Sequence, residues 1–352
     1  MRIAFLLSGE HPSLPYHEVI AVLEAFGIKH NTLLKVDSAC VIEMDASERL
    51  YRIFRERLAF TRSFGRLIGV IEPSKFPNAL DELEPPYITS RFRATAIRIR
   101  GSCRELRTTY IERKIGEWIL SSNKGAKVDL GNPKEEIICL ITSGLLIIYK
   151  REGVVDRTLF KVKEVAARPF VHPASMRPTL ARAMVNLART RPGDLVLDPF
   201  VGVGGIALEI LSVGGKLLGF DISDKMVVEA KNNLISYGFI EDYYITRGDA
   251  LHLDLPTKVD RIVTDPPYGR MSQAVGTTPR ELSEGFIRKV PEYLREGGWL
   301  AMAVPSDYLA EDDFVEAGLI PVQYFDIREH RSLIRRIWVA RVGDNANKVL
   351  RH

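Results

Sequence analysis

The chain contains 352 residues, more than one ordinary hydrophobic core accommodates, so we expect two or three domains. Hydrophobic residues make up 46% of it and charged residues 27%, a balance typical of soluble globular proteins. No apolar run approaches the roughly 20 residues that cross a bilayer, and the first residues turn polar too soon for a signal peptide. These features predict a cytoplasmic protein and argue against a membrane-spanning one.

The three cysteines, Cys40, Cys103 and Cys139, are widely separated and show no C-x-x-C spacing. This pattern indicates neither a zinc site nor a disulfide framework. We therefore predict no bound metal, and thiols that are reduced and buried.

The net charge of +4 is unevenly distributed. Residues 1–165 contain 26 lysines and arginines against 21 acids, whereas residues 166–352 contain 23 against 24. The basic residues of the first half form two clusters: 49–66 has six arginines and one acid, and 91–114 has eight basic residues and two acids. Clustered arginines suit phosphate and are typical of nucleic-acid binding. A solvated helix face is the alternative for either cluster taken alone.

The first half of the chain reads as short strands mixed with amphipathic helices. No glycine-rich phosphate loop occurs in it. Such a mixture predicts small α+β modules. Helices are predicted at 15–27, 47–60, near 75–83 and at 104–122, and strands at 2–7, near 32–44 and at 66–72, 94–101, 135–144 and 145–153.

A junction follows at Pro169, Pro173 and Pro178, after which residues 179–191 show helical periodicity. The rhythm then changes to strands separated by helices, which predicts an α/β fold with a doubly wound parallel sheet. The last two strands have no room for a crossover helix between them, so we expect an antiparallel hairpin. Strands are predicted at 194–198, 216–221, 242–249, 259–265, 299–305, 320–329 and 333–341, and helices at 205–214, 223–238, 278–297 and after residue 307.

Four aspartates mark the ends of four successive predicted strands: Asp198, Asp221, Asp249 and Asp265. Ligands of an open α/β sheet bind beyond the carboxyl ends of its strands, so these positions form the candidate site. Four matching positions are much less expected by chance than one. Taken singly, a helix N-cap would also explain Asp221, and a loop acid would explain Asp249.

A glycine-rich turn follows the first of these acids. Gly202, Gly204 and Gly205 let the backbone approach a ligand, and a helix starting at Gly205 offers free N–H groups. A carboxylate at Asp221 can accept both hydroxyls of a ribose, and Asp249 would accept from an adenine amine. These features fit either NAD or S-adenosylmethionine, since both present a ribose and an adenine.

The motif formed by Asp265, Pro266, Pro267 and Tyr268 separates the two cofactors, because methylation of an exocyclic base amine uses such a turn and hydride transfer does not. The amine is a poor nucleophile, since its lone pair is delocalised into the ring. Hydrogen bonds to the Asp265 carboxylate and the Pro266 carbonyl would favour tetrahedral geometry and align the nitrogen with the sulfonium methyl. Pro267 would fix the turn, and Tyr268 would stack on a base that has left its helix. A proline-terminated strand with a surface tyrosine is the alternative.

Four segments together resemble the class I, Rossmann-like S-adenosylmethionine-dependent methyltransferases that act on base amines: LDPFVGVGG (197–205), FDIS (220–223), GDA (248–250) and TDPPYGR (264–270). The form with aspartate before Pro-Pro-Tyr, preceded by HPASMRPTLARAMVNLAR (172–189), resembles the archaeal tRNA guanosine-10 N2-methyltransferases. Members of that family make N2-methylguanosine and N2,N2-dimethylguanosine. The similarity extends over the whole chain.

This resemblance also implies a domain order. Residues 1–60 resemble an N-terminal ferredoxin-like domain, 61–165 resemble the THUMP RNA-binding domain of tRNA-modifying enzymes, 166–190 form a linker and helix, and 191–352 form the Rossmann-like methyltransferase domain. The expected cofactor is S-adenosylmethionine and the expected partner is tRNA. No obligate protein partner is evident.

Residue roles follow from the resemblance at the matching positions. Catalysis falls to Asp265, Pro266, Pro267 and Tyr268. The methyl donor is held by Asp198, Pro199, Gly202, Gly204, Asp221, Asp249, Ala250 and Thr179. RNA contacts are expected from Arg91, Arg93, Arg98, Arg100 and Arg270, although at most half of the first four share a strand face.

Other interpretations remain open. The nearest in chemistry is an adenine N6-methyltransferase acting on RNA or DNA, because Pro-Pro-Tyr serves amines generally. A catalytically silent RNA-binding protein is the alternative of another class, and an NAD-dependent reductase is the third. One and two methyl transfers are both compatible with the sequence, depending on the room around Tyr268.

Overall fold

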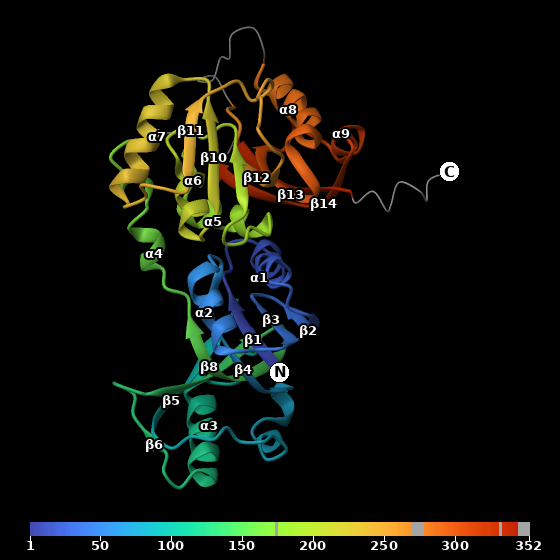
Figure 1. The fold of residues 1–352 in the computed structure, drawn as a ribbon. Coiled ribbons are helices and arrows are strands. Elements are labelled where there is room, and N and C mark those ends of the chain that lie inside the picture. Colours follow the sequence, from blue (N-terminus) through green and yellow to red (C-terminus); the bar gives the residue numbers. More distant parts are fainter. Residues whose placement is uncertain (173–174, 269–277, 331–332, 344–352) are drawn as a thin grey trace. The chain divides into compact units, whose positions relative to one another are not determined.

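The computed structural model describes residues 1–172, 175–268, 278–330 and 333–343. Contacts divide the chain into two compact units, Met1–Leu23 with Gly27–Asp156 and Glu24–Phe26 with Arg157–His352. Each unit contains one sheet (Figure 1). None of the helices in the described ranges has the length and apolar character that a membrane span requires.

The first unit is built on an eight-stranded sheet in the order β2-β3-β1-β4-β8-β7-β5-β6. Neighbouring strands are antiparallel except where β5 pairs with β6 and β7 in parallel. The strands are β1 (Arg2–Leu7), β2 (His30–Val36), β3 (Ala39–Met44), β4 (Thr61–Ile71), β5 (Arg91–Arg98), β6 (Lys127–Val128), β7 (Glu135–Thr142) and β8 (Leu145–Val154). The helices are α1 (Leu14–Ala25), α2 (Glu48–Arg57) and α3 (Thr108–Ser122).

Aromatic side chains attach α2 to this sheet. The ring of Phe54 lies 5.3 Å from that of Phe5 on β1 and 5.2 Å from that of Phe64 on β4, measured between centroids. Phe54 belongs to the buried stripe of an amphipathic helix whose other face carries Arg49, Arg52 and Arg55 of the 49–66 cluster; Arg57 is buried, and Arg62 and Arg66 lie on β4. The sequence pattern and the packing therefore agree at this helix.

The predicted domain boundary at residue 60 falls between α2 and β4, within one continuous sheet. Strand β4 pairs with β1 on one side and with β8 on the other, so the strands of residues 1–60 (β2, β3 and β1) and those of residues 61–165 form two adjacent blocks of the same sheet. The division of residues 1–165 into a ferredoxin-like and a THUMP domain stays a prediction.

The helix predicted near 75–83 is wrong. Two short 3-10 turns, η1 (Pro73–Lys75) and η2 (Asn78–Leu80), occupy the segment instead. Pro77 lies between them, and a proline inside an α-helix removes one backbone hydrogen bond and clashes with the preceding turn. The apolar residues of this segment therefore belong to short turns, which pack against the core of the first unit.

All three cysteines are free thiols. Cys40 and Cys139 are buried in the sheet of the first unit, and Cys103 is half-buried. Burial raises the pKa of the Cys40 and Cys139 thiols well above the ordinary value, so both stay protonated at neutral pH.

The second unit contains a seven-stranded sheet in the order β11-β10-β9-β12-β13-β15-β14. The first five strands in this order are parallel, and β15 pairs antiparallel with both β13 and β14. The predicted α/β sheet with its closing antiparallel hairpin is thus confirmed. Its strands are β9 (Leu195–Asp198), β10 (Lys216–Asp221), β11 (Tyr243–Arg247), β12 (Val259–Thr264), β13 (Leu294–Pro305), β14 (Leu319–His330) and β15 (Leu333–Val342).

Helices cover both sides of this sheet, as the doubly wound arrangement requires, with α7 and α8 on opposite sides (Figure 1). A short helix and a 3-10 turn, α4 (Thr158–Lys161) and η3 (Val165–Ala167), precede them in the first residues of the segment Arg157–His352. The remaining helices are α5 (Pro178–Leu187), α6 (Gly205–Ser212), α7 (Asp224–Ser236), α8 (Pro279–Tyr293) and α9 (Glu311–Glu316).

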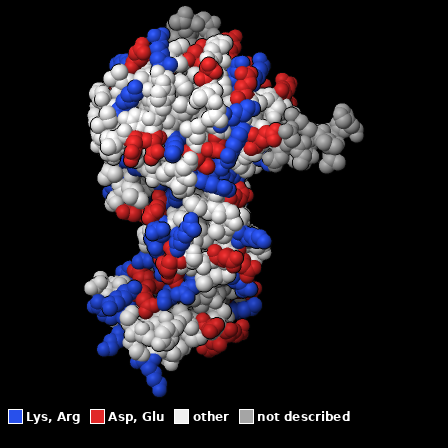
Figure 2. Space-filling view, in the orientation of Figure 1, with Lys and Arg blue, Asp and Glu red and all other residues white. Residues whose placement is uncertain are grey.

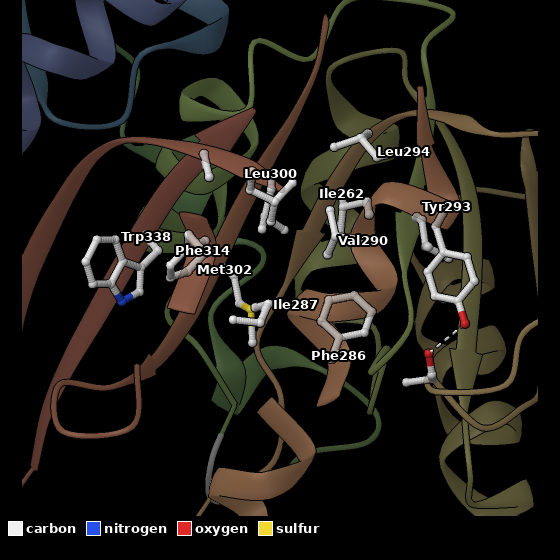
Figure 3. Packing of buried hydrophobic residues seen from close by; sticks show 14 of the residues in the cluster. Ile262, Phe286, Ile287, Val290, Tyr293, Leu294, Leu300, Met302, Phe314 and Trp338 are labelled. Atoms are coloured by element: carbon white, nitrogen blue, oxygen red, sulfur yellow. Dashed lines mark hydrogen bonds between the residues drawn. The ribbon is translucent and has the colours of Figure 1, made fainter. Parts of the chain in front are cut away.

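One core of the second unit lies between α8 and the strands β12 and β13 (Figure 3). Phe286 and Val290 of α8 pack among Ile262 and Leu300 of these strands, and all four side chains are fully buried. The burial of such side chains contributes roughly 1.5–3 kcal/mol each. This core holds β12 rigidly, and β12 leads directly into the Pro-Pro-Tyr motif.

Candidate active site

The carboxyl ends of β11, β10, β9 and β12 lie side by side, in that order, in the parallel part of the sheet. The order in which successive strands are added to the sheet reverses at β9, which pairs with both β10 and β12. Ligands of doubly wound folds bind at such a switch point. The structure therefore brings the four predicted acids together along the carboxyl ends of these strands, the edge of the sheet referred to below. Asp221 ends β10, Asp198 ends β9, Asp265 directly follows β12, and Asp249 lies two residues beyond β11.

The turn after Asp198 contains two glycines in the left-handed region, Gly202 with a φ of 51° and Gly204 with a φ of 84°. A residue with a side chain is strained there. A Cβ on Gly202 would meet nothing closer than the Phe200 carbonyl at 4.0 Å, so the turn faces open space at this point. Gly204 packs against α7 instead, where a Cβ would lie 3.5 Å from the Ala230 Cα. A ligand can therefore approach the backbone at Gly202, whereas Gly204 serves helix packing.

Asp221 accepts a backbone hydrogen bond on each oxygen. Gly202 donates to Oδ2 at 3.0 Å and Ser223 donates to Oδ1 at 2.9 Å. Burial raises the pKa of Asp221, while these two bonds and the nearby His172 oppose that rise. Each carboxylate oxygen has a further lone pair, so the group can still accept from a diol. The next residue, Ile222, exposes 62% of its surface and offers an apolar face to a flat heterocycle.

Asp249 and Ala250 form a fixed turn beyond β11. Oδ1 of Asp249 accepts from the backbone N–H of Leu251 at 3.0 Å. Ala250 is buried, and its carbonyl accepts from the Tyr293 hydroxyl at 3.2 Å (Figure 3). The same hydroxyl accepts from the Leu253 N–H at 3.1 Å, so Tyr293 ties two points of this turn to the end of α8.

Asp198 is buried, with 1% of its surface exposed. The Thr264 hydroxyl donates to its Oδ1 at 2.8 Å, and the Phe200 N–H donates to the same oxygen at 3.3 Å. Oδ2 is buried and has no hydrogen-bond partner among the described residues. Burial raises the pKa of Asp198 to about 7; the two hydrogen bonds limit the rise, and the charges of Asp265 and Asp221 add to it. A buried carboxyl with one unpaired oxygen is suited to a cationic ligand group.

Asp265 and Tyr268 share one partner, Arg335 of β15. Arg335 Nη2 lies 3.7 Å from Asp265 Oδ2, and the same nitrogen donates to the Tyr268 hydroxyl. Burial raises the pKa of Asp265 to about 6; Arg335 limits this rise and Glu329 adds to it. Oδ1 of Asp265 is buried and accepts no hydrogen bond from any described residue. It is therefore the unoccupied acceptor of the motif.

The remaining predicted site residues are prolines of the two turns, Thr179 of α5 and Arg270. Pro266 and Pro199 are buried, and Pro267 is half-buried, within the turns that follow β12 and β9. Thr179 is the second residue of α5 and half-buried; the recorded hydrogen bonds of the described ranges do not connect it to the four acids. Arg270 lies outside the described residues.

Four residues of this site do not follow from the sequence interpretation: His172, Ile222, Tyr293 and Arg335. Two of them leave a signal in the sequence. Ile222 is an apolar residue directly after a strand-end acid, and Arg335 alternates with buried Ile337 and so falls on the buried face of its strand. Tyr293 and His172 carry no such local signal, since their roles depend on contacts made in the folded chain.

Two of the arginines predicted to contact RNA share a face of β5. Arg91 and Arg93 are two residues apart on the strand. Arg91 Nη1 lies 3.3 Å from Asp129 Oδ2, and Arg93 forms an ion pair with Glu136. Both side chains are partly exposed, so their guanidinium groups remain within reach of a phosphate.

The other two arginines have different surroundings. Arg98 donates to three backbone carbonyls, those of Ser102, Cys103 and Leu106, so its guanidinium organises the loop after β5. Arg100 is exposed and lies 3.2 Å from an Asp37 carboxylate oxygen. Arg100 therefore remains a candidate for RNA contact, whereas Arg98 has a structural task.

Comparison with protein families gives two matches. Residues 166–325 match the family model described as RMKL-like, methyltransferase domain. Residues 12–232 match a model described as DNA methylase. The second match ends before Asp265, so it does not include the Pro-Pro-Tyr motif.

Two archaeal relatives align with nearly the whole chain, and a bacterial one aligns with about two thirds of it. A tRNA (guanine(10)-N2)-dimethyltransferase of Methanothermobacter thermautotrophicus is 36% identical over 340 residues, covering 96% of this chain and 99% of the relative. One of Methanocaldococcus jannaschii is 30% identical over 364 residues, with the same two coverages. A tRNA (guanine(6)-N2)-methyltransferase of Thermus thermophilus is 30% identical over 257 residues, 71% of each chain.

Solved structures agree on the fold. TrmN from Thermus thermophilus has a TM-score of 0.54 at 21% identity, covering 97% of this chain and 100% of its own. A putative methyltransferase crystallised with SAH has a TM-score of 0.53 at 12% identity, covering 98% of each chain. Both likenesses support the methyltransferase fold, and the full-length relatives supply the family. This chain therefore belongs to the family of the tRNA (guanine(10)-N2)-dimethyltransferases, and it is an S-adenosylmethionine-dependent methyltransferase.

Proposed function

We propose that this protein transfers methyl groups from S-adenosylmethionine to the exocyclic N2 amine of guanosine 10 in tRNA, forming N2-methylguanosine and then N2,N2-dimethylguanosine. The observation that supports this most is the placement of Asp265, with its unoccupied Oδ1, beside the strand ends that carry Asp198 and Asp221. The names of the full-length relatives support the choice of substrate.

The residues at this edge fit the methyl donor. Asp221 and the exposed Ile222 suit a ribose diol and one face of an adenine, and Asp249 on the next strand suits the adenine amine. The unpaired, buried Oδ2 of Asp198 suits an ammonium group, and the backbone at Gly202 is open to close approach. These residues would hold S-adenosylmethionine, which supplies an electrophilic methyl group on a positively charged sulfur.

Asp265 prepares the amine for the transfer. The N2 lone pair of guanine is delocalised into the ring, and hydrogen bonds to Asp265 Oδ1 and the Pro266 carbonyl favour the tetrahedral geometry that releases it. The nitrogen becomes positively charged when it gains the methyl group, and it then loses a proton. The Asp265 carboxylate would take that proton: the N–H bond breaks, its electron pair stays on nitrogen, and an O–H bond forms.

Tyr268 would hold the base during this step. Tyr268 is half-buried and follows Pro266 by two residues in the sequence. A guanine inside a helical stem has to leave its stack to reach this position, which costs a few kcal/mol. Stacking on an aromatic ring contributes about 1–3 kcal/mol per base and offsets part of that cost.

The first unit would bind the tRNA, with residues 1–60 as a ferredoxin-like domain and residues 61–165 as a THUMP domain. The arginine clusters at 49–66 and 91–114 support this role, because they place guanidinium groups on α2 and along β5. Figure 2 shows basic side chains interspersed with acidic ones on the face of this unit that it draws.

The product of the reaction tests the proposal. Unmodified tRNA transcripts are incubated with the protein and methyl-labelled S-adenosylmethionine, digested to nucleosides and separated. Label in N2-methylguanosine and N2,N2-dimethylguanosine is the expected result. Label in N6-methyladenosine would establish the adenine alternative, and calorimetry that detects no binding of the donor would support a silent RNA-binding protein.

A further inference from the structure

Arg335 is a charged residue in a buried position. It lies on β15 with 6% of its side chain exposed, and its backbone pairs with Pro305 of β13 on one side and Ile327 of β14 on the other. A buried guanidinium is costly unless anions and acceptors surround it. The groups that contact Arg335 therefore indicate its role.

Three side chains from two segments surround the guanidinium. Nη1 lies 3.0 Å from Glu329 Oε1 of β14. Nη2 donates to the Tyr268 hydroxyl and lies 3.7 Å from Asp265 Oδ2. The guanidinium carbon also lies 5.3 Å from the centre of the Tyr268 ring. One arginine thus contacts both functional side chains of the Pro-Pro-Tyr motif, while Glu329 anchors the opposite side of its fork.

The two oxygens of the Asp265 carboxylate have different surroundings. Oδ2 faces Arg335, whereas Oδ1 is buried and without a partner among the described residues. Fixing one oxygen of a carboxylate fixes the plane and direction of the other. The Tyr268 ring is held by the same guanidinium, which donates to its hydroxyl and whose carbon lies over the ring, 5.3 Å from its centre.

We propose that Arg335 is a positioning residue for methyl transfer, which holds Asp265 through Oδ2 and Tyr268 through its hydroxyl, and so presents Oδ1 to the target amine and the ring to the target base. This inference rests on the proposed function for the identity of the amine. The arrangement itself is a property of the motif and β15, and it can be measured without substrate.

The charges around Asp265 also affect the pKa of its carboxyl group. Burial and the negative charge of Glu329 on β14 favour a proton on Asp265, and Arg335 is the positive group that opposes them. A protonated Asp265 has one acceptor fewer and cannot take the proton that leaves the amine. Arg335 therefore keeps the carboxylate ionised at neutral pH as well as aligned.

Two substitutions of Arg335 separate these effects from simple packing. R335Q removes the charge and keeps a polar side chain, and R335K keeps the charge without the planar fork that reaches several partners. R336Q is the matched control, because Arg336 is the next residue of the same strand and pairs with Asp326 of β14 at 2.7 Å. E329Q is a fourth variant, which removes a negative charge near Asp265 and should shift its titration in the opposite direction.

The first measurement is the titration of the Asp265 carboxyl, followed by NMR in protein with ¹³C-labelled aspartate and assigned with D265N. We expect R335Q to raise the midpoint by about one unit or more, R336Q to leave it unchanged and E329Q to lower it. An R335Q midpoint equal to that of the unsubstituted protein would overturn the proposal. This readout requires no tRNA, so it stands even if the proposed function fails.

The second measurement is the single-turnover methylation rate as a function of pH. R335Q is expected to lose roughly 100-fold at pH 7 while its affinity for S-adenosylhomocysteine, measured by calorimetry, stays within about twofold. R335K should retain an intermediate rate with a pH midpoint close to the original. If the unsubstituted protein makes methylguanosine in tRNA and R335Q matches its rate and pH profile, the inference fails and the proposed function stands; if no methylguanosine forms, the proposed function fails instead.

Discussion

The Thr264 hydroxyl, at the end of β12, donates a 2.8 Å hydrogen bond to Oδ1 of Asp198, at the end of β9. These strands are parallel neighbours, and the residue after Thr264 is Asp265. Asp198, which is proposed to hold the methyl donor, and the turn that is proposed to bind the base are therefore joined through one buried hydrogen bond. This hydrogen bond fixes the turn after β12 relative to the end of β9.

A Thr264→Val variant breaks this link with little change in shape. The hydroxyl stabilises the charged form of Asp198, so its loss should raise the pKa of that carboxyl further above about 7. The affinity for S-adenosylhomocysteine should fall at pH 7 and be partly restored at pH 8, because its ammonium group requires a carboxylate and more of Asp198 is ionised at the higher pH. Calorimetry at the two pH values checks this, with Thr264→Ser as the control that keeps the hydroxyl. Equal losses at both pH values would contradict the explanation.

Asp198 is expected to reduce stability at neutral pH. Burial raises its pKa to about 7 in the folded state, whereas an unfolded aspartate titrates near 3.9. The unfolded state therefore binds fewer protons between these values, and the contribution that is present below pH 4 is lost as the pH rises through 7. Asp198→Asn should be more stable than the parent protein, by a margin that grows from pH 5 to pH 8, yet bind S-adenosylhomocysteine poorly. Thermal unfolding at both pH values measures the margin, and a constant margin would contradict the assigned pKa.

Asp265→Ala should impair the chemical step selectively. The carboxylate is proposed to act on the amine during transfer, so the single-turnover rate should fall by about 100-fold or more. Binding of tRNA and S-adenosylhomocysteine should change by less than about threefold, since neither depends mainly on Oδ1. Filter binding and calorimetry provide these controls. Parallel losses of binding and rate would indicate a structural role for the residue instead.

Tyr293→Phe removes a hydroxyl that contacts the turn beyond β11 at the Ala250 carbonyl and the Leu253 N–H. The variant should lose about 1 kcal/mol in free energy of unfolding and bind S-adenosylhomocysteine a few-fold more weakly, because the turn that carries Asp249 is then less fixed. Tyr308→Phe is a suitable control, since its ring packs against the same core. Chemical denaturation and calorimetry measure the two effects. Unchanged affinity in the less stable variant would show that the turn keeps its shape without the hydroxyl.

Two arginines of β5 should behave differently when replaced by alanine. Arg91→Ala should weaken tRNA binding and reduce the slope of log affinity against log salt by up to about one, with little effect on stability. Arg98→Ala should lower the melting temperature, because three backbone carbonyls lose their shared donor. Salt-dependent filter binding and thermal unfolding distinguish the cases. A drop in tRNA affinity for Arg98→Ala without any loss of stability would reverse the assignment.

Much of the second unit can be predicted from the sequence, because its strands are short apolar runs that each end at a turn. Asp198 and Asp221 end such runs directly, and a parallel sheet then places them on one edge without further information. The hairpin of β14 and β15 follows from the short connection alone. The first unit is less regular: prolines convert the apolar spacing near residue 77 into 3-10 turns, and the two-residue strand β6 leaves no periodic signal.

The contacts that complete the site depend on long-range packing and could not be predicted. Arg335 lies 67 residues beyond Tyr268, and it reaches the motif only because β15 inserts between β13 and β14 in one particular register. A shift of that register by one residue would turn Arg335 to the opposite face and bring Arg336 toward the motif. Strand periodicity identifies a buried arginine on β15, but its partners are set by the pairing.

The central claim is that the target is the exocyclic amine of one guanosine. Inosine differs from guanosine only by lacking this amine, so a tRNA with inosine at position 10 tests the claim directly. Labelled methyl groups should enter the guanosine-10 tRNA and be recovered as N2-methylguanosine and N2,N2-dimethylguanosine, while the inosine-10 tRNA should remain at background and still compete for binding. Equal incorporation into both tRNAs would contradict the account.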